Sequence, residues 1–478
     1  MVRKCLLRLC FAVVILLSAG CSRLTGSGGP ETSKTPETDT EAMSEGELPT
    51  IWLEPATTET NAQETEPEAG TEAGIEWEMT AVIASDIHYM AGDLTDGGSY
   101  FQYMVEHGDG KVVTYIKPIT DAFLEEVVRR KPEVLILSGD LTLDGEKKSH
   151  QGLAEKLKGV KAAGIPVLVI PGNHDINNRR AAKYMGEERL PAEFTTPGEF
   201  LAIYKDFGYG DAISRDRTSL SYVYQLDEYN RFLMMDTCQY QPNAKVGGAI
   251  LADTYDWIEA QLEAAWDEGM NIIPVGHHNL LDQSEIYVDD CTIEHGEQLA
   301  DMLNDWSVPL FLSGHLHVQH AKRSEYGYGI WEVVTSSLAT PACQYGILKF
   351  RDDESFGYHT QAVDVKRWVV EHNRKEKDLL EFDAFKEPFL RRVFYNQSYD
   401  ELSKLKSLTE KQRQLMSEFY SDLNYHYYQG TTYGIRTAAH KDPAFKLWEE
   451  EGSVTQLGDY VRYIIEDAKW NYNYLETD

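Results

Sequence analysis

Apolar runs and amphipathic repeats alternate along the middle of this chain, from about residue 80 to residue 365. Residues 134–137 and 167–170 are short, continuous apolar runs, as expected for strands buried on both faces. Residues 151–163 carry apolar side chains every three or four positions and predict a helix. Further strands are expected at 80–85, 232–235, 272–275, 310–312, 330–335, 347–350 and 359–365, and further helices at 117–131, 255–266 and 297–303. This alternation predicts an α/β fold with a parallel-rich sheet that helices cover.

The pattern changes near residue 366, where strand-like runs stop and long amphipathic repeats take over. One expected helix has Leu415, Phe419 and Leu423 on a single face. The apolar face of another consists of Leu457, Val461, Ile464 and Ala468. The sequence therefore predicts two domains. An α/β domain, expected to be the catalytic one, covers residues 78–365, and an all-helical C-terminal domain covers residues 366–478.

The first 77 residues predict a targeting segment followed by a tether. A basic start with Arg3 and Lys4 precedes the short apolar run 9–17, after which small residues lead into Cys21. This pattern resembles a bacterial lipoprotein signal. The resemblance implies a signal peptide over residues 1–21 and a lipid on Cys21 that anchors the protein at the extracellular face of the cell membrane. An ordinary signal peptide or a membrane anchor remains the alternative.

The composition of the chain excludes some classes of binding partner. The segment 22–77 is rich in Thr, Glu, Pro and Gly and is expected to be a disordered acidic tether, with one apolar island at 51–53. The formal net charge of −33 argues against binding a nucleic acid duplex, which requires clustered Lys and Arg. Outside the N-terminal segment only Cys238, Cys291 and Cys343 remain, and they form no CxxC pair. We expect buried thiols, with one disulfide at most.

Five short motifs follow five of the expected strands, and each supplies Asp, Asn or His. They are Asp86-Ile87-His88, Gly139-Asp140, Gly172-Asn173-His174-Asp175, Gly276-His277-His278 and Gly314-His315-Leu316-His317. In open α/β sheets, ligands bind at the carboxyl ends of the strands, so these segments are expected to converge. Strand periodicity places the two side chains of each D-x-H or H-x-H pair on one side. Mixed carboxylate, amide and imidazole donors suit Mn, Fe or Zn.

The five blocks resemble those of the calcineurin-like metallophosphoesterase superfamily over residues 80–365. This resemblance implies a four-layer α-β-β-α sandwich that holds two metal ions. One ion would be held by Asp86, His88, Asp140 and His317, and the other by Asp140, Asn173, His277 and His315. His174 would lie beside the substrate phosphate as the catalytic residue. Two such ions lower the pKa of a water between them, and the resulting hydroxide attacks phosphorus.

The sequence leaves the roles of Asp175 and His278 undecided. Asp175 either orients His174 or points away from it, because adjacent side chains often diverge. His278 either faces the substrate or packs. His150 and His320 are expected at the surface.

Two features of the sequence indicate the substrate class within the superfamily. Purple acid phosphatases place a Tyr ligand where Leu143 stands, so Leu143 together with His88 favours a phosphodiesterase. The helical extension resembles bacterial class III cyclic-nucleotide phosphodiesterases of lipoprotein type, which implies a 3′,5′-cyclic nucleotide as the small-molecule substrate. The segment 425–428 is expected to form a core or domain contact, or else to stack on a base. The alternatives are a broad phosphodiesterase or monoesterase acting on glycerophosphodiesters, nucleotides or cell-wall fragments, and a non-catalytic surface binding protein.

Overall fold

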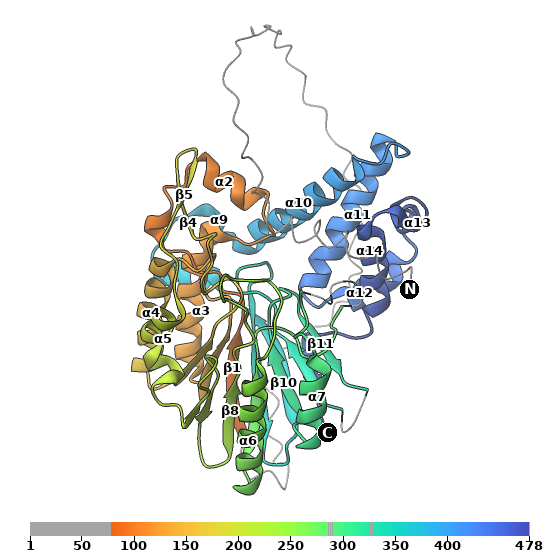
Figure 1. Ribbon diagram of the computed structural model, residues 1–478. Coiled ribbons are helices and arrows are strands. Elements are labelled where there is room, and N and C mark those ends of the chain that lie inside the picture. Colours follow the sequence, from red (N-terminus) through yellow and green to blue (C-terminus); the bar gives the residue numbers. More distant parts are fainter. Residues whose placement is uncertain (1–77, 285, 287, 289, 326–328, 478) are drawn as a thin grey trace, which may run out of the picture.

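Two β-sheets face each other between outer layers of helices, and a separate group of helices lies above one end of the sheets (Figure 1). The computed structural model describes residues 78–284, 286, 288, 290–325 and 329–477. The predictions for Cys21, the tether and the island 51–53 lie outside the described residues. The layered arrangement confirms the predicted α-β-β-α sandwich with a helical C-terminal region.

The first sheet has six strands in the order β15-β14-β13-β1-β2-β3, of which β1, β2 and β3 are parallel. Its strands are β1 (Glu78–Ala84), β2 (Val134–Ser138), β3 (Val167–Ile170), β13 (Gln344–Arg351), β14 (Phe356–Ala362) and β15 (Tyr474–Glu476). Every residue of β2 and β3 is buried, because helices cover one face and the second sheet covers the other.

The second sheet has seven strands in the order β11-β12-β10-β9-β8-β7-β6, with β8, β9, β10 and β12 parallel. Its strands are β6 (Ser214–Arg215), β7 (Tyr222–Gln225), β8 (Asn230–Met234), β9 (Asn271–Val275), β10 (Leu310–Ser313), β11 (His320–Arg323) and β12 (Trp331–Val334). A small hairpin of β4 (Ala182–Met185) and β5 (Glu188–Pro191) lies beside the sandwich.

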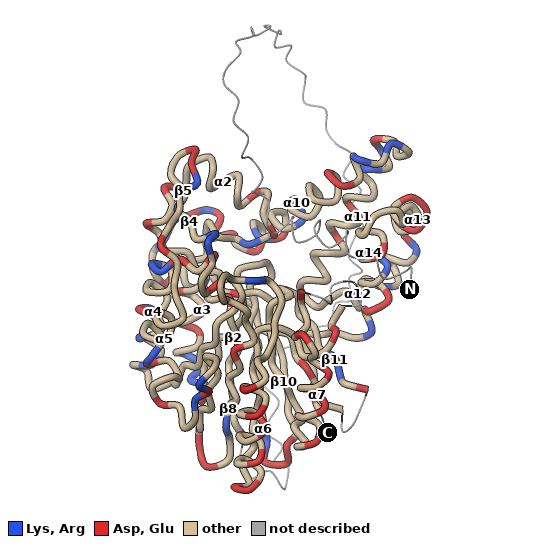
Figure 2. The backbone as a smooth tube through the Cα atoms, in the orientation of Figure 1, with Lys and Arg blue, Asp and Glu red and all other residues tan. Residues whose placement is uncertain are grey.

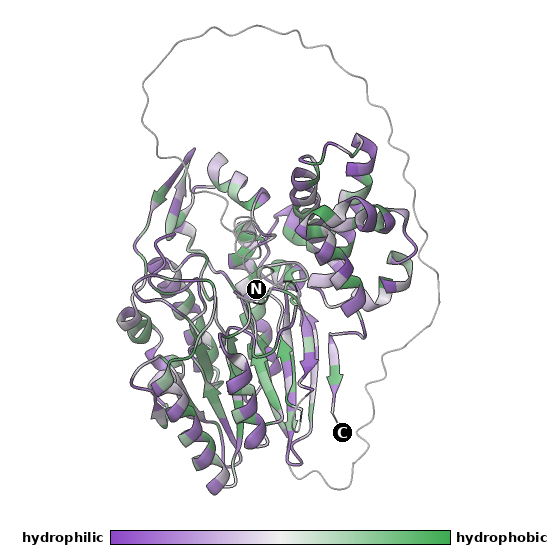
Figure 3. Ribbon diagram, turned by 45° about the vertical axis from the view of Figure 1, so that its right-hand side comes forward, coloured by the Kyte–Doolittle hydropathy of each residue, from purple (hydrophilic) through white to green (hydrophobic). Residues whose placement is uncertain are grey.

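Successive side chains along a strand pack into opposite layers of the sandwich. On β8, Phe232 and Met234 belong to the core between the sheets, whereas Leu233 packs with the helices on the outer face. The interior of both sheets is accordingly apolar, and the covering helices turn their polar sides outward (Figure 3). The covering helices are α3 (Ile116–Arg130) and α4 (Lys147–Ala162) on the first sheet, and α6 (Ala252–Asp267) and α7 (Gly296–Asp305) on the second. Of two shorter helices, α2 (Ser99–Glu106) contacts the β4–β5 hairpin and α5 (Pro197–Ile203) contacts α4.

The helical region has its own core. Its helices are α8 (Val365–Glu371), α9 (Lys377–Leu380), α10 (Phe382–Leu402), α11 (Glu410–Tyr428), α12 (Thr432–Ala439), α13 (Pro443–Glu450) and α14 (Gln456–Asp467). Trp448 is fully buried, and its indole N–H donates to the carbonyl oxygen of Met416. After α14 the chain returns to the first sheet and adds β15 antiparallel to β14.

The predicted face of α11 is wrong only at Leu415, since Leu423 is 1% exposed and Phe419 packs against the helical core. Leu415 is 37% exposed, and the neighbouring Met416 is fully buried instead. Met416 and Tyr420 face the core around Trp448, with the Tyr420 and Trp448 rings 5.8 Å apart. The predicted face of α14 is correct, since Leu457, Val461, Ile464 and Ala468 are all buried. The error at Leu415 arises because the buried face of α11 also includes Met416 and Tyr420, which the predicted pattern did not count.

The cysteines within the described residues form no disulfide. Cys238, Cys291 and Cys343 are free thiols; Cys343 is buried and the other two are half-buried. Asp and Glu are frequent in the loops at the lower end of the sheets near α6 and β8 (Figure 2). None of the described helices is both long and apolar enough to cross a membrane.

Candidate active site

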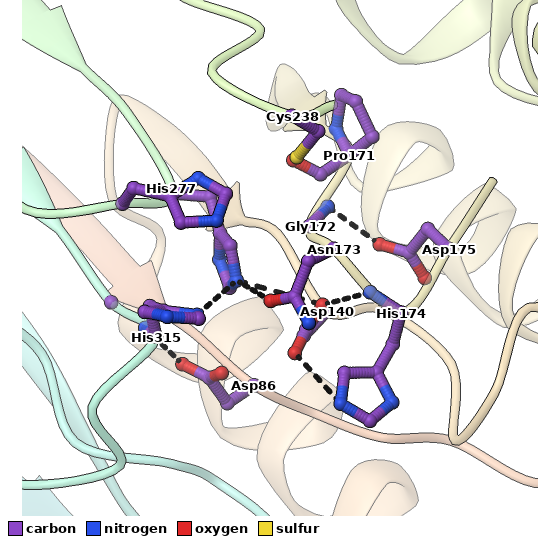
Figure 4. Close-up of polar contacts among 12 residues, drawn as sticks. Asp86, Asp140, Pro171, Gly172, Asn173, His174, Asp175, Cys238, His277 and His315 are labelled. Carbon is purple, nitrogen blue, oxygen red and sulfur yellow. Dashed lines mark hydrogen bonds and ion pairs between the residues drawn. The ribbon is translucent and has the colours of Figure 1, made fainter. Parts of the chain in front are cut away.

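All five motifs lie at the same end of the sandwich, just beyond the carboxyl ends of their strands (Figure 4). Asp86 follows β1, Asp140 follows β2 and Asn173 follows β3 in the first sheet. His277 follows β9 and His315 follows β10 in the second sheet. The structure therefore brings together segments that are more than 200 residues apart in the chain.

Five of the seven expected ligands have a left-handed backbone. Their φ angles are +52° at Asp86, +46° at His88, +47° at Asp140, +72° at His315 and +61° at His317. Such conformations cost about 1–3 kcal/mol each in non-glycine residues and cluster at functional sites. They correct the expectation from strand periodicity: β1 ends at Ala84 and β10 at Ser313, so turns in the backbone aim these side chains inward.

The first expected metal set forms one compact group. Asp86, His88, Asp140 and His317 each offer one ligand atom, and these atoms lie within 4.8 Å of one another. The Nε2 atoms of His88 and His317 are 3.1 Å apart. Oδ1 of Asp86 lies 3.3 Å from Nε2 of His317, and Oδ2 of Asp140 lies 3.7 Å from Nε2 of His88.

The second expected set lies on the other side of Asp140. Nε2 of His277 is 3.2 Å from Oδ1 of Asn173, 3.5 Å from Oδ1 of Asp140 and 3.3 Å from Nδ1 of His315. The opposite ring nitrogens are held by backbone carbonyls, since His277 Nδ1 donates to Ser138 and His315 Nε2 donates to Asp290. These bonds fix the ring orientations, as second partners of metal-binding histidines do.

The donor set fits metal cations. Burial lowers the pKa of His88, His277 and His315, the last to about 3, so the rings are neutral and present lone pairs to one another. Oδ1 of Asp86 is buried and has no hydrogen-bond partner. Facing lone pairs and an unsatisfied carboxylate oxygen are costly unless a cation lies among them. The Asp and His cluster therefore suits divalent metal ions.

Asp140 occupies the position between the two sets, with one carboxylate oxygen toward each. Its Oδ1 also accepts a hydrogen bond of 2.8 Å from the backbone N–H of His174. Burial raises the pKa of Asp140 well above its usual range, and the charges of Asp86 and Asp175 raise it further. A carboxylate in this position would be stabilised by positive charge, which bound metal ions would provide.

His174 lies at the edge of this group with its Nε2 atom 3.8 Å from Oδ2 of Asp140. Its Nδ1 atom is 2.7 Å from the carbonyl oxygen of Leu143 and 3.2 Å from Oδ1 of Asp144. Both are acceptors, so Nδ1 carries a proton and donates. Burial lowers the pKa of His174, and the charge of Lys111 lowers it further, whereas Asp144 raises it.

Asp144 is the residue that orients His174, and the sequence analysis missed it. It lies in the loop after β2, four residues beyond Asp140, where no strand or helix pattern singles it out. Asp175, the alternative raised from sequence, points away from the His174 ring. Its carboxylate accepts from the backbone N–H groups of Leu141 and Gly172 and so ties the loop after β2 to the loop after β3.

Three other histidines have structural roles. Nε2 of His278 donates to the carbonyl oxygen of Val246, and its Nδ1 lies 2.8 Å from the hydroxyl of Thr237, so His278 packs and has no free lone pair for a metal. The prediction that His150 and His320 lie at the surface is wrong, because they are 0% and 2% exposed. Hydrogen bonds to other buried groups, which a sequence pattern does not show, compensate their burial.

The aromatic segment 425–428 forms a core and a domain contact. Tyr427 is buried in the helical core, and Tyr428 packs against Phe394 with ring centroids 4.8 Å apart. The carbonyl oxygen of Tyr428 accepts from the backbone N–H of Gln319, which lies just before the start of β11 in the second sheet. The Tyr425 ring lies under the guanidinium of Arg391. This segment therefore joins the helical region to the sandwich.

The fold and the site define a metallophosphoesterase. Residues 79–319 match the family of calcineurin-like phosphoesterases, and the chain belongs to this family of metal-dependent phosphoric ester hydrolases. Residues 364–471 match the C-terminal domain of cyclic nucleotide phosphodiesterase, a second family that covers the helical region.

Individual relatives are distant. The chain is 24% identical to a probable cyclic nucleotide phosphodiesterase of Synechococcus over 42% of its length and 64% of that relative. It is 24% identical to a probable glycerophosphodiester phosphodiesterase of Arcobacter nitrofigilis over 51% of its length and 76% of that relative. Among solved structures, a dimetal phosphatase from Danio rerio aligns with a TM-score of 0.43 at 14% identity, covering 59% of this chain and 96% of that one.

Proposed function

We propose that the protein is a two-metal phosphodiesterase that hydrolyses 3′,5′-cyclic nucleotides. The match of residues 364–471 to the C-terminal domain of cyclic nucleotide phosphodiesterase carries the substrate class. Support also comes from the Synechococcus relative, whose name gives the same activity, and from Leu143 in the place of a Tyr ligand.

The chemistry follows from the positions of the residues. The two sets that share Asp140 would hold the ions, which when bound supply an activated water and neutralise charge on the phosphoryl oxygens. His174 has its Nδ1 proton committed to Leu143 and Asp144, so its Nε2 atom is available to the substrate. We infer that the ring, when it is protonated at both nitrogens, donates a hydrogen bond from Nε2–H to the phosphoryl group and passes that proton to the leaving oxygen, while Nδ1 keeps its own proton. The identity of the ions is proposed to be Mn, Fe or Zn.

A substrate panel with defined metals tests this function. Chelator-treated protein is reloaded with Mn, Fe or Zn and assayed on a bis-aryl phosphodiester, cyclic AMP, a glycerophosphodiester and an aryl phosphomonoester. We expect turnover of the bis-aryl ester and of cyclic AMP, and none with chelator. If no metal-loaded form hydrolyses any phosphoester, the protein is a surface binding protein and the proposal is wrong.

A second substrate class has one specific observation in its favour. The Arcobacter nitrofigilis relative is named for glycerophosphodiesters and aligns over a larger share of its length than the Synechococcus relative does. If cyclic AMP is untouched and the glycerophosphodiester is cleaved, the two-metal mechanism stands and the substrate class changes to this alternative.

We further propose that the enzyme acts outside the cell, anchored through a lipid on Cys21. The support is the N-terminal sequence alone, which lies outside the described residues. Replacing Cys21 with Ala should move the protein from the membrane fraction to the soluble extracellular fraction. Unchanged membrane association of this variant would contradict the lipid anchor.

A further inference from the structure

A buried lysine lies close to the metal centre and has no role in the chemistry described so far. Lys111 is only 6% exposed. Its Nζ atom is 2.7 Å from Oδ2 of Asp109, whose side chain is 27% exposed. Burying an ammonium group is costly, and an ion pair with one carboxylate often offsets only part of that cost.

The backbone places Lys111 beside the first metal set. The N–H of Val112, the next residue, donates to the carbonyl oxygen of Ala339 at 2.8 Å. The N–H of Ala339 in turn donates to the carbonyl oxygen of Asp86 at 3.3 Å. The loop that carries Lys111 is thus joined to the backbone of the first metal-binding carboxylate through the turn that contains Ala339.

The charge of Lys111 lies close to the site. Lys111 is near enough to His88, His174 and Asp140 for its charge to act on all three.

The helical region holds this loop in place. The side-chain amide of Gln397, on α10, donates to the carbonyl oxygen of Gly108 at 3.0 Å. Gly110 has φ +88°, and a Cβ there would lie 2.5 Å from Cδ1 of Leu390, also on α10. A side chain at position 110 would displace the Leu390 side chain and strain the backbone. The position of Lys111 therefore depends on α10.

We propose that the Lys111 ammonium binds a non-bridging oxygen of the substrate phosphoryl group at the metal centre, and that α10 positions it there. Asp109 would neutralise Lys111 when no phosphoryl group is bound. Lysine binds phosphate as a point charge, and a phosphodiester supplies one negative charge that the ammonium can balance. This inference rests on the proposed phosphoesterase function and makes the helical region part of the binding site for any phosphoester.

The test measures the binding of inorganic phosphate to the Mn-loaded full-length protein by calorimetry, with metal content determined in parallel. Lys111→Met should keep both metals and weaken phosphate binding about 10- to 100-fold, since a hydrogen bond to a charged group is lost. Lys111→Arg should restore binding to within about fivefold of wild type. As a matched control, Lys386→Met removes a similarly buried lysine that pairs with Asp383 on α10, and phosphate binding should not change.

A double variant separates the proposal from a purely structural role. If Lys111 only neutralises Asp109, Asp109→Asn combined with Lys111→Met should recover wild-type phosphate binding, and the proposal fails. If Lys111 binds phosphate, the double variant stays weak, and this comparison also decides the matter should Lys111→Met alone fail to fold. Phosphate affinity within twofold of wild type in Lys111→Met would equally overturn the proposal. Because phosphate binding requires no turnover, a failure of the cyclic-nucleotide assignment is seen separately in the substrate panel.

Discussion

The carboxylate of Asp144 and the imidazole of His174 form a partly buried pair, with Oδ1 of Asp144 3.2 Å from Nδ1 of His174. Asp144 is itself held by the side-chain amide of Asn178 and by the guanidinium of Arg180, 3.3 Å away in each case. The carboxylate cannot rotate freely, so it fixes both the orientation of the ring and the nitrogen that carries the proton.

Replacing Asp144 with Asn should lower kcat about tenfold while leaving both metals bound. The amide keeps the shape but removes the charge that favours protonated His174. His174→Ala should have a larger effect, about 100-fold or more, again with metals retained. Steady-state kinetics and metal analysis check both variants, with Asp253→Asn on the exposed face of α6 as a control. Loss of metal from His174→Ala would place His174 among the ligands.

Asp140→Asn should abolish activity and lower the metal content. The substitution removes the negative charge that lies between the two sets and replaces one carboxylate oxygen with an amide nitrogen that cannot ligate a cation. Metal analysis after dialysis, together with turnover of the bis-aryl phosphodiester, measures the effect. Turnover near the wild-type rate would contradict the assignment of Asp140 as the shared ligand.

Asp175→Ala should destabilise the protein by about 3 kcal/mol in urea unfolding. The carboxylate accepts from the backbone N–H groups of Leu141, Thr142 and Gly172 and from the Thr142 hydroxyl, all in the buried interior. Truncation leaves these donors without a partner. The measurement uses chelator-treated protein so that metal loss does not contribute. A change below about 0.5 kcal/mol would show that the two loops do not depend on Asp175.

Glu146→Gln should flatten the dependence of stability on pH. Burial, and next the charge of Asp144, raise the pKa of Glu146 to about 8 from 4.5, so the folded protein binds a proton there that the unfolded chain releases. The free energy of unfolding of the wild type therefore falls as pH rises from 4.5 to 8, and the proton-linked stability is fully present only below that window. Gln has no proton that titrates in this range, so the free energy of unfolding of Glu146→Gln does not decrease for this reason as pH rises.

Urea unfolding at pH 5 and pH 8.5 measures this difference. The wild type should lose more stability between these two values than Glu146→Gln does. Glu259→Gln, on the exposed face of α6, should follow the wild type. Equal losses in the wild type and Glu146→Gln would mean that Glu146 does not hold its proton in the folded state.

The sequence predicted the central strands well, and it predicted which motifs the fold brings together, because both follow from local patterns. Strands β2 and β3 are buried on both faces and therefore appear as uninterrupted apolar runs, and the ligand motifs come directly after such runs. The seven expected ligands come together because parallel strands end at one edge. In contrast, Asp144 and Lys111 have roles that depend on partners distant in sequence, and their neighbours along the chain show no period that marks them.

The same limit explains the errors elsewhere. His150 interrupts the apolar pattern of α4 and was expected in solvent, yet its ring bonds to Tyr204 and to the backbone of Asp175. The left-handed turns at Asp86 and His315 are stabilised by the assembled site, so residue type alone does not predict them. Strand β15 has only three residues and depends on β14 for its hydrogen bonds.

The position of β15 determines how the helical region can be deleted in an experiment. The chain leaves the first sheet after β14 and rejoins it at β15, next to the same strand, so the helices are an insertion between two neighbouring strands of one sheet. Cutting the gene near residue 366 would remove a sheet strand as well as the helices and would leave the edge of β14 bare. A cleaner deletion would replace residues between α8 and β15 with a short linker, keeping both points of attachment. For the same reason, the helices cannot swing out on a single hinge, and any opening above the metal centre must bend the chain at two places.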